Sequence, residues 1–156
     1  TRIYMQFQNR FWENESLSGW GNTDIPEEIW QPTWDLSGDT GVIMSYLRWT
    51  PAENMDALSE QERIDYVLNR WENVFPGATN NLDSGTSQSW AQEEWSKGAW
   101  ASPTSSQDAA LANHVGLAEG DIHFAGEHAS NDRGWMQGAL VSGLRAANEI
   151  NTANKF

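Results

Sequence analysis

The feature that most constrains the fold of this sequence is a short apolar run that ends in glycine and precedes a polar loop and a long amphipathic stretch. Residues 122–126 predict a strand, and residues 135–150 predict a helix with one apolar face. The helix begins just after Gly134, where unpaired N–H groups and a partial positive charge suit an anion or an electron-rich carbonyl. An ordinary strand-to-helix crossover, with Asn131 or Asp132 capping the helix, is the alternative.

Strand and helix patterns also occur earlier in the chain. Ile3, Met5 and Phe7 alternate with polar residues, which is typical of a strand with one buried face. Ser59 and Glu62 form a capping box ahead of an apolar stripe, which predicts a helix start. Strands are predicted at 3–8, 42–47 and 122–126. Helices are predicted at 59–75, at 105–112, where Ser105 opens the helix, and at 135–150. Residues 13–40 are predicted to be irregular, and residues 80–88 are predicted to form polar turns. This order indicates a mixed α/β or α+β fold.

The apolar face of the last predicted helix contains several small side chains. Small residues let a helix lie close against a sheet or a ligand, so we expect this face to be covered. It comprises Met136, Ala139, Leu140, Gly143, Leu144, Ala147 and Ile150.

Composition excludes several classes of protein. Nine basic against 22 acidic residues give a net charge of −13, which disfavours nucleic acid and anionic membrane surfaces as partners. No apolar run approaches the roughly 18 residues of a membrane span. The chain has no cysteine and only three histidines without metal-ligand spacing, so we expect no disulfide and no metal site. Of the ten tryptophans, Trp12 and Trp71 are predicted to lie in the core. The sequence starts at Thr1 directly before a predicted strand, so we expect the chain to be a fragment of a longer precursor.

Three motifs resemble a known family. Ile122-His-Phe-Ala-Gly-Glu-His128, Gly134-Trp-Met-Gln-Gly-Ala139 and Ser142-Gly-Leu-Arg-Ala-Ala147 resemble the C-terminal flavin motif of the monoamine oxidase and L-amino-acid oxidase superfamily. Thr1–Phe7 with Phe11-Trp12, then Gly41–Tyr46, and then Ser89-Trp90 with Trp95 and Trp100 resemble earlier segments of the same family. The whole chain therefore corresponds to the C-terminal third of such an oxidase.

The resemblance implies the C-terminal part of a two-domain FAD-binding oxidoreductase fold. Residues 1–89 would form part of the substrate-binding domain, and residues 90–156 would form the C-terminal part of the FAD-binding domain. No G-x-G-x-x-G occurs in the sequence, so the dinucleotide-binding unit is expected on other chains of the same precursor. Within the family, the sequence is most similar to the small processed subunit of an L-glutamate oxidase-type enzyme.

The resemblance also assigns residues to the cofactor. Glu127 would accept hydrogen bonds from the ribityl or pyrophosphate region of FAD, or it caps N–H groups of its own loop. The backbone around Gly134 would lie at the flavin pyrimidine edge, where the helix N-terminus stabilises negative charge. The cofactor-binding residues implied in this way are Gly126, Glu127, Gly134, Trp135, Met136, Ala139, Trp90 and Trp95.

For the substrate, the resemblance implies four residues: Tyr46, Arg48, Gly134 and Trp135. Tyr46 corresponds to a tyrosine whose hydroxyl binds the α-carboxylate, although it is alternatively an aromatic residue of the strand interior. Arg48 lies two residues further on, so it is expected on the same face of the strand. There it would either aim a cation at an acidic substrate side chain or pair with one of the 22 carboxylates.

One position departs from the family pattern. Many members carry a lysine that holds a water at the flavin, nine residues before the Phe of the Phe-Trp pair, and Arg2 stands there in this sequence. Arginine and lysine are not interchangeable, so we assign no catalytic role to Arg2. His123 lies among apolar residues and is predicted to be structural, and no catalytic base is assigned.

Together these features predict part of a secreted, proteolytically processed flavoprotein L-amino-acid oxidase. It would use FAD and O2 to convert an L-amino acid, with L-glutamate first, into a 2-oxo acid, ammonia and hydrogen peroxide. The processed protomer is expected to assemble as a homo-oligomer, and Asn14 begins a glycosylation sequon. The alternatives are an amine or polyamine oxidase of the same fold and, in another class, a tryptophan-rich module that binds carbohydrate by ring stacking.

Overall fold

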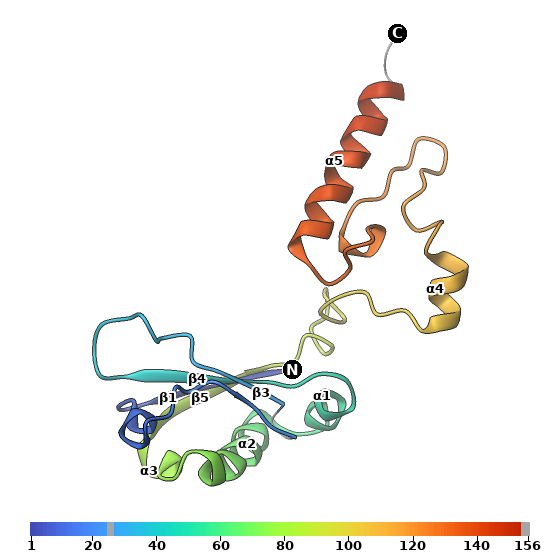
Figure 1. Ribbon diagram of the computed structural model, residues 1–156. Coiled ribbons are helices and arrows are strands. Elements are labelled where there is room, and N and C mark those ends of the chain that lie inside the picture. Colours follow the sequence, from blue (N-terminus) through green and yellow to red (C-terminus); the bar gives the residue numbers. More distant parts are fainter. Residues whose placement is uncertain (25–26, 154–156) are drawn as a thin grey trace. The chain divides into compact units, whose positions relative to one another are not determined.

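The computed structural model describes residues 1–24 and 27–153, and these form two compact units (Figure 1). The first unit is Thr1–Lys97 and the second is Gly98–Phe156. The division follows Lys97, whereas the sequence suggested a domain boundary after residue 89. The assignment of the two parts to substrate-binding and flavin-binding domains stays a prediction, and residues 154–156 lie outside the described residues.

Among the described residues of the first unit, five strands form an antiparallel sheet with the order β2-β3-β4-β1-β5. The predictions of strands at 3–8 and 42–47 are confirmed, each displaced by one residue. The strands are β1 (Arg2–Phe7), β2 (Gly21–Asn22), β3 (Glu28–Trp30), β4 (Gly41–Tyr46) and β5 (Leu82–Gln88). Among its described residues, the region predicted as irregular at 13–40 contains the short β2 and β3 and most of a 3-10 turn, η1 (Phe11–Glu15).

The prediction of polar turns at 80–88 is wrong, because most of this segment is β5. The strand pairs with β1 at the edge of the sheet, and most of its side chains are exposed, so it lacks the alternation that would have indicated a strand. Gly85 lies in the middle of β5. A Cβ there would meet the Ile64 side chain at 3.1 Å, so glycine lets the neighbouring helix approach the strand closely.

Three helices of the first unit lie on one side of the sheet (Figure 1). They are α1 (Trp49–Asp56), α2 (Glu60–Val74) and α3 (Ala78–Asn81). The predicted helix at 59–75 is α2, and its capping box is present: the Ser59 N–H donates to Glu62 at 2.8 Å, and the Ser59 hydroxyl accepts from the Glu62 N–H at 3.4 Å. α1 was not predicted, although Pro51 is tolerated in the first turn of a helix.

The core lies between the sheet and α2. Trp12 and Trp71 are both 0% exposed, which confirms their predicted place in the core. Phe7 links them, with ring centroids 5.7 Å from Trp12 and 6.2 Å from Trp71. The other large buried apolar residues are Ile3, Met5, Phe11, Ile29, Ile43, Leu47, Met55, Ile64, Val67, Leu68 and Phe75.

The second unit contains α4 (Ser105–Leu111), a 3-10 turn η2 (Glu127–Ala129) and α5 (Met136–Ala153). The helices predicted at 105–112 and 135–150 are confirmed, but α4 is capped by Thr104 and Gln107 rather than opened by Ser105. The strand predicted at 122–126 is wrong. Ile122 makes only an isolated bridge with Glu119, since the described residues supply no neighbouring strand to this segment.

The apolar face predicted for α5 is exposed within the described residues. Met136, Leu140 and Leu144 are 87%, 70% and 66% exposed, whereas the helix buries Gly138, Ser142 and Ala146. A Cβ on Gly138 would lie 2.2 Å from the Asp132 carbonyl oxygen, so the buried side needs glycine to approach the preceding loop. The helix therefore packs through its small and polar edge and leaves its large apolar side chains open.

Candidate functional site

Glu127 holds together the loop that precedes α5. One carboxylate oxygen accepts a hydrogen bond from the Ala101 N–H at 2.6 Å, and the other accepts one from the Gly134 N–H at 2.7 Å. The carboxylate therefore ties two segments of the second unit together just before the last helix. This is the loop-capping role that the sequence left open, and it is compatible with a ligand because a carboxylate has about four acceptor sites.

Two glycines shape this loop. Gly126 has φ 145° and Gly134 has φ 76°, both in the region that favours glycine. A Cβ on Gly126 would lie 2.4 Å from the His128 ring, and the side chain of Trp100 lies beside Gly134. Gly126 therefore lets the loop pack closely against its own His128, whereas the exposed Gly134 leaves the backbone before α5 accessible to a ligand.

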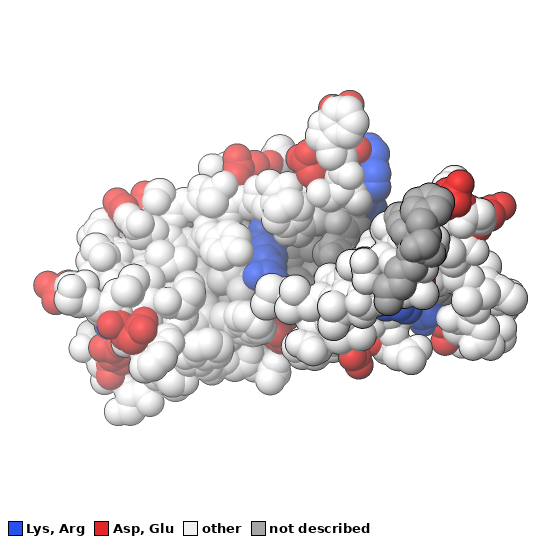
Figure 2. All heavy atoms as spheres, turned by 90° about the horizontal axis from the view of Figure 1, so that it is seen from above, with Lys and Arg blue, Asp and Glu red and all other residues white. Residues whose placement is uncertain are grey.

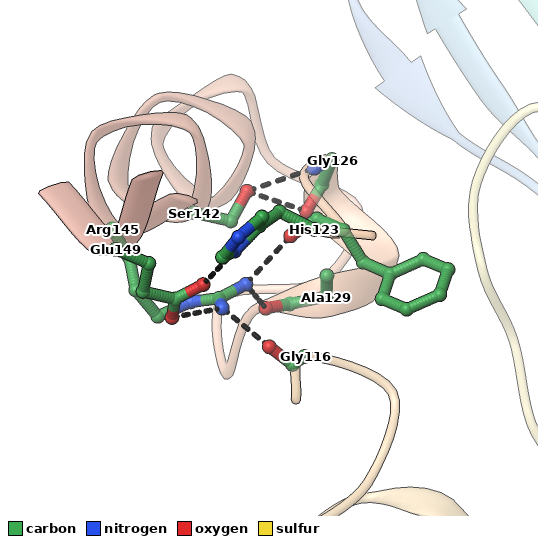
Figure 3. A network of polar contacts seen from close by, with 8 residues as sticks. Gly116, His123, Gly126, Ala129, Ser142, Arg145 and Glu149 are labelled. Carbon is green, nitrogen blue, oxygen red and sulfur yellow. Dashed lines mark hydrogen bonds and ion pairs between the residues drawn. The ribbon is translucent and has the colours of Figure 1, made fainter. Parts of the chain in front are cut away.

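A network of polar contacts anchors the loop to α5 (Figure 3). The Ser142 hydroxyl accepts from the Gly126 N–H at 2.9 Å and lies 2.7 Å from the carbonyl oxygen of the same residue. Arg145 donates to the carbonyl oxygens of Gly116 and of Phe124, the latter at 2.8 Å, and pairs with Glu149 at 2.8 Å. These contacts could not be predicted from the sequence beyond the place of their residues in the family motif.

Glu149 also contacts His123. The His123 Nδ1 lies 2.9 Å from a Glu149 carboxylate oxygen, which agrees with the structural role predicted for this histidine. Hydrogen bonds from His123 and then from Arg145 lower the pKa of the Glu149 carboxyl group below its usual value. The network therefore keeps Glu149 charged and holds the loop against the helix.

The start of α5 is open to a ligand. Trp135 and Met136 are 72% and 87% exposed, and Ala139 one turn later is half-buried. The first N–H groups of a helix have no intrahelical acceptor, so they are available to an electron-rich ring edge. The exposed backbone, the glycine at 134 and the spare acceptor capacity of Glu127 fit the flavin that the sequence resemblance implies.

A second group of predicted site residues lies on the first unit, on the sheet. In the register of the sheet, Tyr46 of β4 pairs with Arg2 of β1 on one side and with Glu28 of β3 on the other. Directly paired residues share a face of the sheet, so the three side chains form a row. The Arg2 guanidinium carbon lies 4.3 Å from the centroid of the Tyr46 ring and 5.9 Å from that of Trp30.

Arg48 pairs with carboxylates. It lies beyond the end of β4, as the residue before α1, and its guanidinium is 2.7 Å from Glu28 and 3.5 Å from Glu27. Its guanidinium carbon is also 5.6 Å from the centroid of the Tyr46 ring. Of the two roles that the sequence left open for Arg48, the structure shows the ion pair.

Tryptophans flank this row. Trp30 stands next to Tyr46, with ring centroids 6.0 Å apart, and Trp20 lies 6.0 Å from Trp30. The indole N–H of Trp30 donates to Glu28 at 3.1 Å. Trp20, Trp30 and Glu28 were not among the predicted site residues. Trp20 precedes the two-residue β2, and Glu28 and Trp30 lie on the three-residue β3, which is too short for a periodic pattern to reveal which residues face Tyr46.

The predicted site residues thus fall into two groups within the described residues. The first unit brings together Tyr46 and Arg48, and also carries Trp90 and Trp95, which are 42% and 86% exposed. The second unit brings together Gly126, Glu127, Gly134, Trp135, Met136 and Ala139. In the described part of the chain, no cluster of three or more potential metal ligands occurs, and no helix has the length and apolarity of a membrane span.

Comparison with known proteins identifies relatives along the whole chain. The profile of a family described as flavin containing amine oxidoreductase matches residues 1–151. The chain is 36% identical to the YobN protein of Bacillus subtilis (strain 168) over 97% of its length, and 31% identical to an L-amino-acid oxidase of Siganus canaliculatus, also over 97%. These alignments cover 33% and 30% of the two relatives, so the chain spans about a third of their length.

Among solved structures, cyclohexylamine oxidase from Brevibacterium oxydans IH-35A shares the fold. The TM-score is 0.87, and the match covers 99% of this chain and 35% of that chain. The two sequences are 20% identical. This match places the mixed α/β arrangement within the two-domain FAD-binding fold expected from the sequence.

Proposed function

The chain belongs to the flavin-containing amine oxidoreductases, whose cofactor is FAD, and we propose that it forms part of an enzyme that oxidises L-amino acids. The first-choice substrate is L-glutamate. The products would be a 2-oxo acid, ammonia and hydrogen peroxide. Family membership replaces the alternative of a carbohydrate-binding module, which explained the tryptophans and the acidity but not the motifs at 126–128 and 134–139.

One observation carries this proposal: the row formed by Arg2, Tyr46 and Glu28 on the sheet, beside Arg48. Two guanidinium groups lie within 6 Å of one phenol ring, at 4.3 Å and 5.6 Å from its centroid. A phenol hydroxyl beside a cation is a suitable donor set for a carboxylate. An amino acid carries a carboxylate on the carbon that bears its amine, so this row favours an amino acid as the substrate.

In the proposed enzyme, FAD accepts a hydride from the substrate, and this chain supplies binding and orientation. Tyr46 would donate to the substrate α-carboxylate, and Trp135 would form an aromatic wall of the pocket. Glu127 would accept from the ribityl hydroxyls while it holds the loop, and the first N–H groups of α5 would face the electron-rich edge of the ring. Trp90 and Trp95 are assigned to the surroundings of the ring.

The relatives are about three times as long as this chain, which supports a partner polypeptide, or a further part of the same one, that carries the dinucleotide-binding unit. Proteolytic processing, secretion and assembly of the protomer into a homo-oligomer remain proposals from the sequence resemblance.

The alternative is an amine oxidase, and the fold match to a cyclohexylamine oxidase favours it. The two candidates differ in whether the substrate carries a carboxylate. The test is an oxidation assay of the complete flavoprotein with peroxide detection, using L-glutamate, L-leucine and L-phenylalanine against putrescine and cyclohexylamine. Peroxide release with the amino acids only supports the proposal. Release with the amines only overturns it in favour of the amine oxidase.

A further inference from the structure

Arg2 is a positively charged side chain without an ion-pair partner among residues 1–24 and 27–153 of this acidic protein. None of the ion pairs among the described residues includes Arg2, although the sequence contains 22 carboxylates. Figure 2 shows one face of the molecule on which acidic side chains are spread widely and basic ones are few. An unpaired guanidinium in such a protein is available to an anion that comes from outside.

Glu27 and Glu28, the two acidic residues that pair with Arg48, are already engaged. Glu28 uses one oxygen for Arg48 at 2.7 Å and the other for the indole N–H of Trp30 at 3.1 Å. Glu27 accepts from the backbone N–H of Arg48 at 2.7 Å. Glu28 is two strands away from Arg2, about 10 Å across the sheet. Both carboxylates therefore neutralise Arg48, and neither forms an ion pair with Arg2 in the described part of the chain.

Aromatic rings hold Arg2 in place. Its guanidinium carbon lies 4.3 Å from the centroid of the Tyr46 ring and 5.9 Å from that of Trp30. Ring faces attract a cation without neutralising its charge. Hydrogen bonds to the Tyr4 and Tyr46 side chains also hold the guanidinium and use part of its five N–H donors, so it keeps its charge and further donors. A guanidinium fixed in this way is preorganised for a planar carboxylate.

We propose that Arg2 is a specificity-determining residue that supplies the positive charge for the substrate carboxylate and so distinguishes amino acids from simple amines. This inference rests on the proposed function, because it places the substrate beside Tyr46. Arg48, which the sequence suggested as the cation for an acidic substrate, is neutralised by Glu28, so the role passes to Arg2. The same charge repels a substrate that is only a cation, such as a diamine.

The binding experiment uses the complete flavoprotein and two probes of similar shape and opposite charge, benzoate and benzylamine, measured by titration calorimetry. Arg2→Met removes the charge and keeps an apolar side chain over the rings. We expect benzoate affinity to fall by about tenfold to a hundredfold, since hydrogen bonds to charged groups contribute that much, while benzylamine affinity stays the same or rises. Arg2→Lys should keep part of the benzoate affinity. An equal change for both probes, or no change for either, overturns the inference.

Arg70→Met is the matched control. The Arg70 guanidinium lies 3.5 Å from the centroid of the Tyr66 ring on α2, so this variant removes the same kind of cation–ring contact away from the proposed site. It should change neither affinity. Oxidation of L-leucine and of 3-methylbutylamine, which lacks only the carboxylate, completes the test. We expect Arg2→Met to raise the KM for L-leucine and not that for the amine.

The outcomes separate the inference from the proposed function. If the wild-type protein oxidises L-leucine and Arg2→Met changes neither KM nor benzoate binding, the proposed function stands and the role of Arg2 is overturned. If the wild-type protein oxidises only amines, the proposed function fails, and the calorimetric comparison still decides whether Arg2 selects an anion.

Discussion

The carboxylate of Glu127 accepts a hydrogen bond of 2.7 Å from the backbone N–H of Gly134, and its other oxygen accepts one of 2.6 Å from Ala101. The bond to Gly134 fixes the residue at which the chain turns into α5. The bond to Ala101 ties the same point to a segment 26 residues earlier. A single side chain thus positions the start of the helix that is assigned to the flavin.

Glu127→Gln should loosen this loop and weaken flavin binding. A carboxamide presents one oxygen and one NH2 group, so one of the two backbone N–H donors would face another donor. The lost charge-assisted bond corresponds to about 1–3 kcal/mol, reduced here because the site is partly exposed. The ratio of flavin absorbance to protein absorbance after gel filtration should fall. Glu119→Gln, which removes an exposed carboxylate from the same unit, should leave the ratio unchanged, and an unchanged ratio for both variants would exclude the role of Glu127.

The packing of Gly41 against Trp12 gives a stability prediction. A Cβ on Gly41 would lie 2.5 Å from Cη2 of the buried Trp12 ring, so Gly41→Ala should destabilise the first unit by about 1–3 kcal/mol through overpacking. Gly21→Ala is the control, because no atom lies within 4 Å of a Cβ at that strand position. Urea denaturation followed by tryptophan fluorescence measures both. Equal midpoints for the two variants would contradict the prediction.

Arg63 is buried and forms no ion pair with a carboxylate of the residues that the structure describes. Its guanidinium donates to the Met55 carbonyl at 2.8 Å and to the Gln92 side chain at 2.8 Å, which joins α1 to the segment after β5. Arg63→Met would leave the Met55 carbonyl without this donor and should cost about 2–3 kcal/mol. Arg70→Met on the same helix should cost less, about 1 kcal/mol, because Arg70 is only half-buried and loses a cation–ring contact with Tyr66 and one hydrogen bond of 3.2 Å to the Tyr66 carbonyl. The comparison is made by urea denaturation, and a smaller loss for Arg63→Met than for Arg70→Met would reject this role.

The sequence predicted the elements whose pattern is local. Ile3, Met5 and Phe7 alternate because one face of β1 is buried, and Ser59 with Glu62 marks the start of α2 through contacts three residues apart. β5 was not predicted, because most side chains of this edge strand are exposed and its sequence therefore does not alternate between apolar and polar residues. The strand at 122–126 was predicted from its composition, but a strand also needs a neighbour, and the described residues of the second unit provide none.

The residues of the candidate site likewise fall into those that a local motif predicts and those that depend on distant parts of the sequence. Gly126, Glu127 and Gly134 could be found because a continuous motif carries them, and the structure brings them together through short-range bonds. The partners of Tyr46 could not be found, since pairing with Arg2 and Glu28 depends on the register of three strands that are distant in the sequence. The sequence predicts Arg48 on the same strand face as Tyr46, but β4 ends at Tyr46, so Arg48 lies beyond the strand.

Acid should destabilise the first unit partly through Glu72. This carboxylate accepts from the backbone N–H groups of Thr79 and Gly77 and from the Thr79 hydroxyl, at 2.8–2.9 Å, and these bonds lower its pKa below the usual 4.5. A lowered folded-state pKa adds stability above pH 4.5 that is lost as the pH falls below that value through the folded-state pKa. Thermal unfolding from pH 7 to pH 3 should therefore show a shallower acid decline for Glu72→Gln, with a lower starting Tm, because an amide neither titrates nor accepts all three bonds. Glu53→Gln, an exposed change on α1, should keep the wild-type curve, and parallel curves for wild type and Glu72→Gln would refute the linkage.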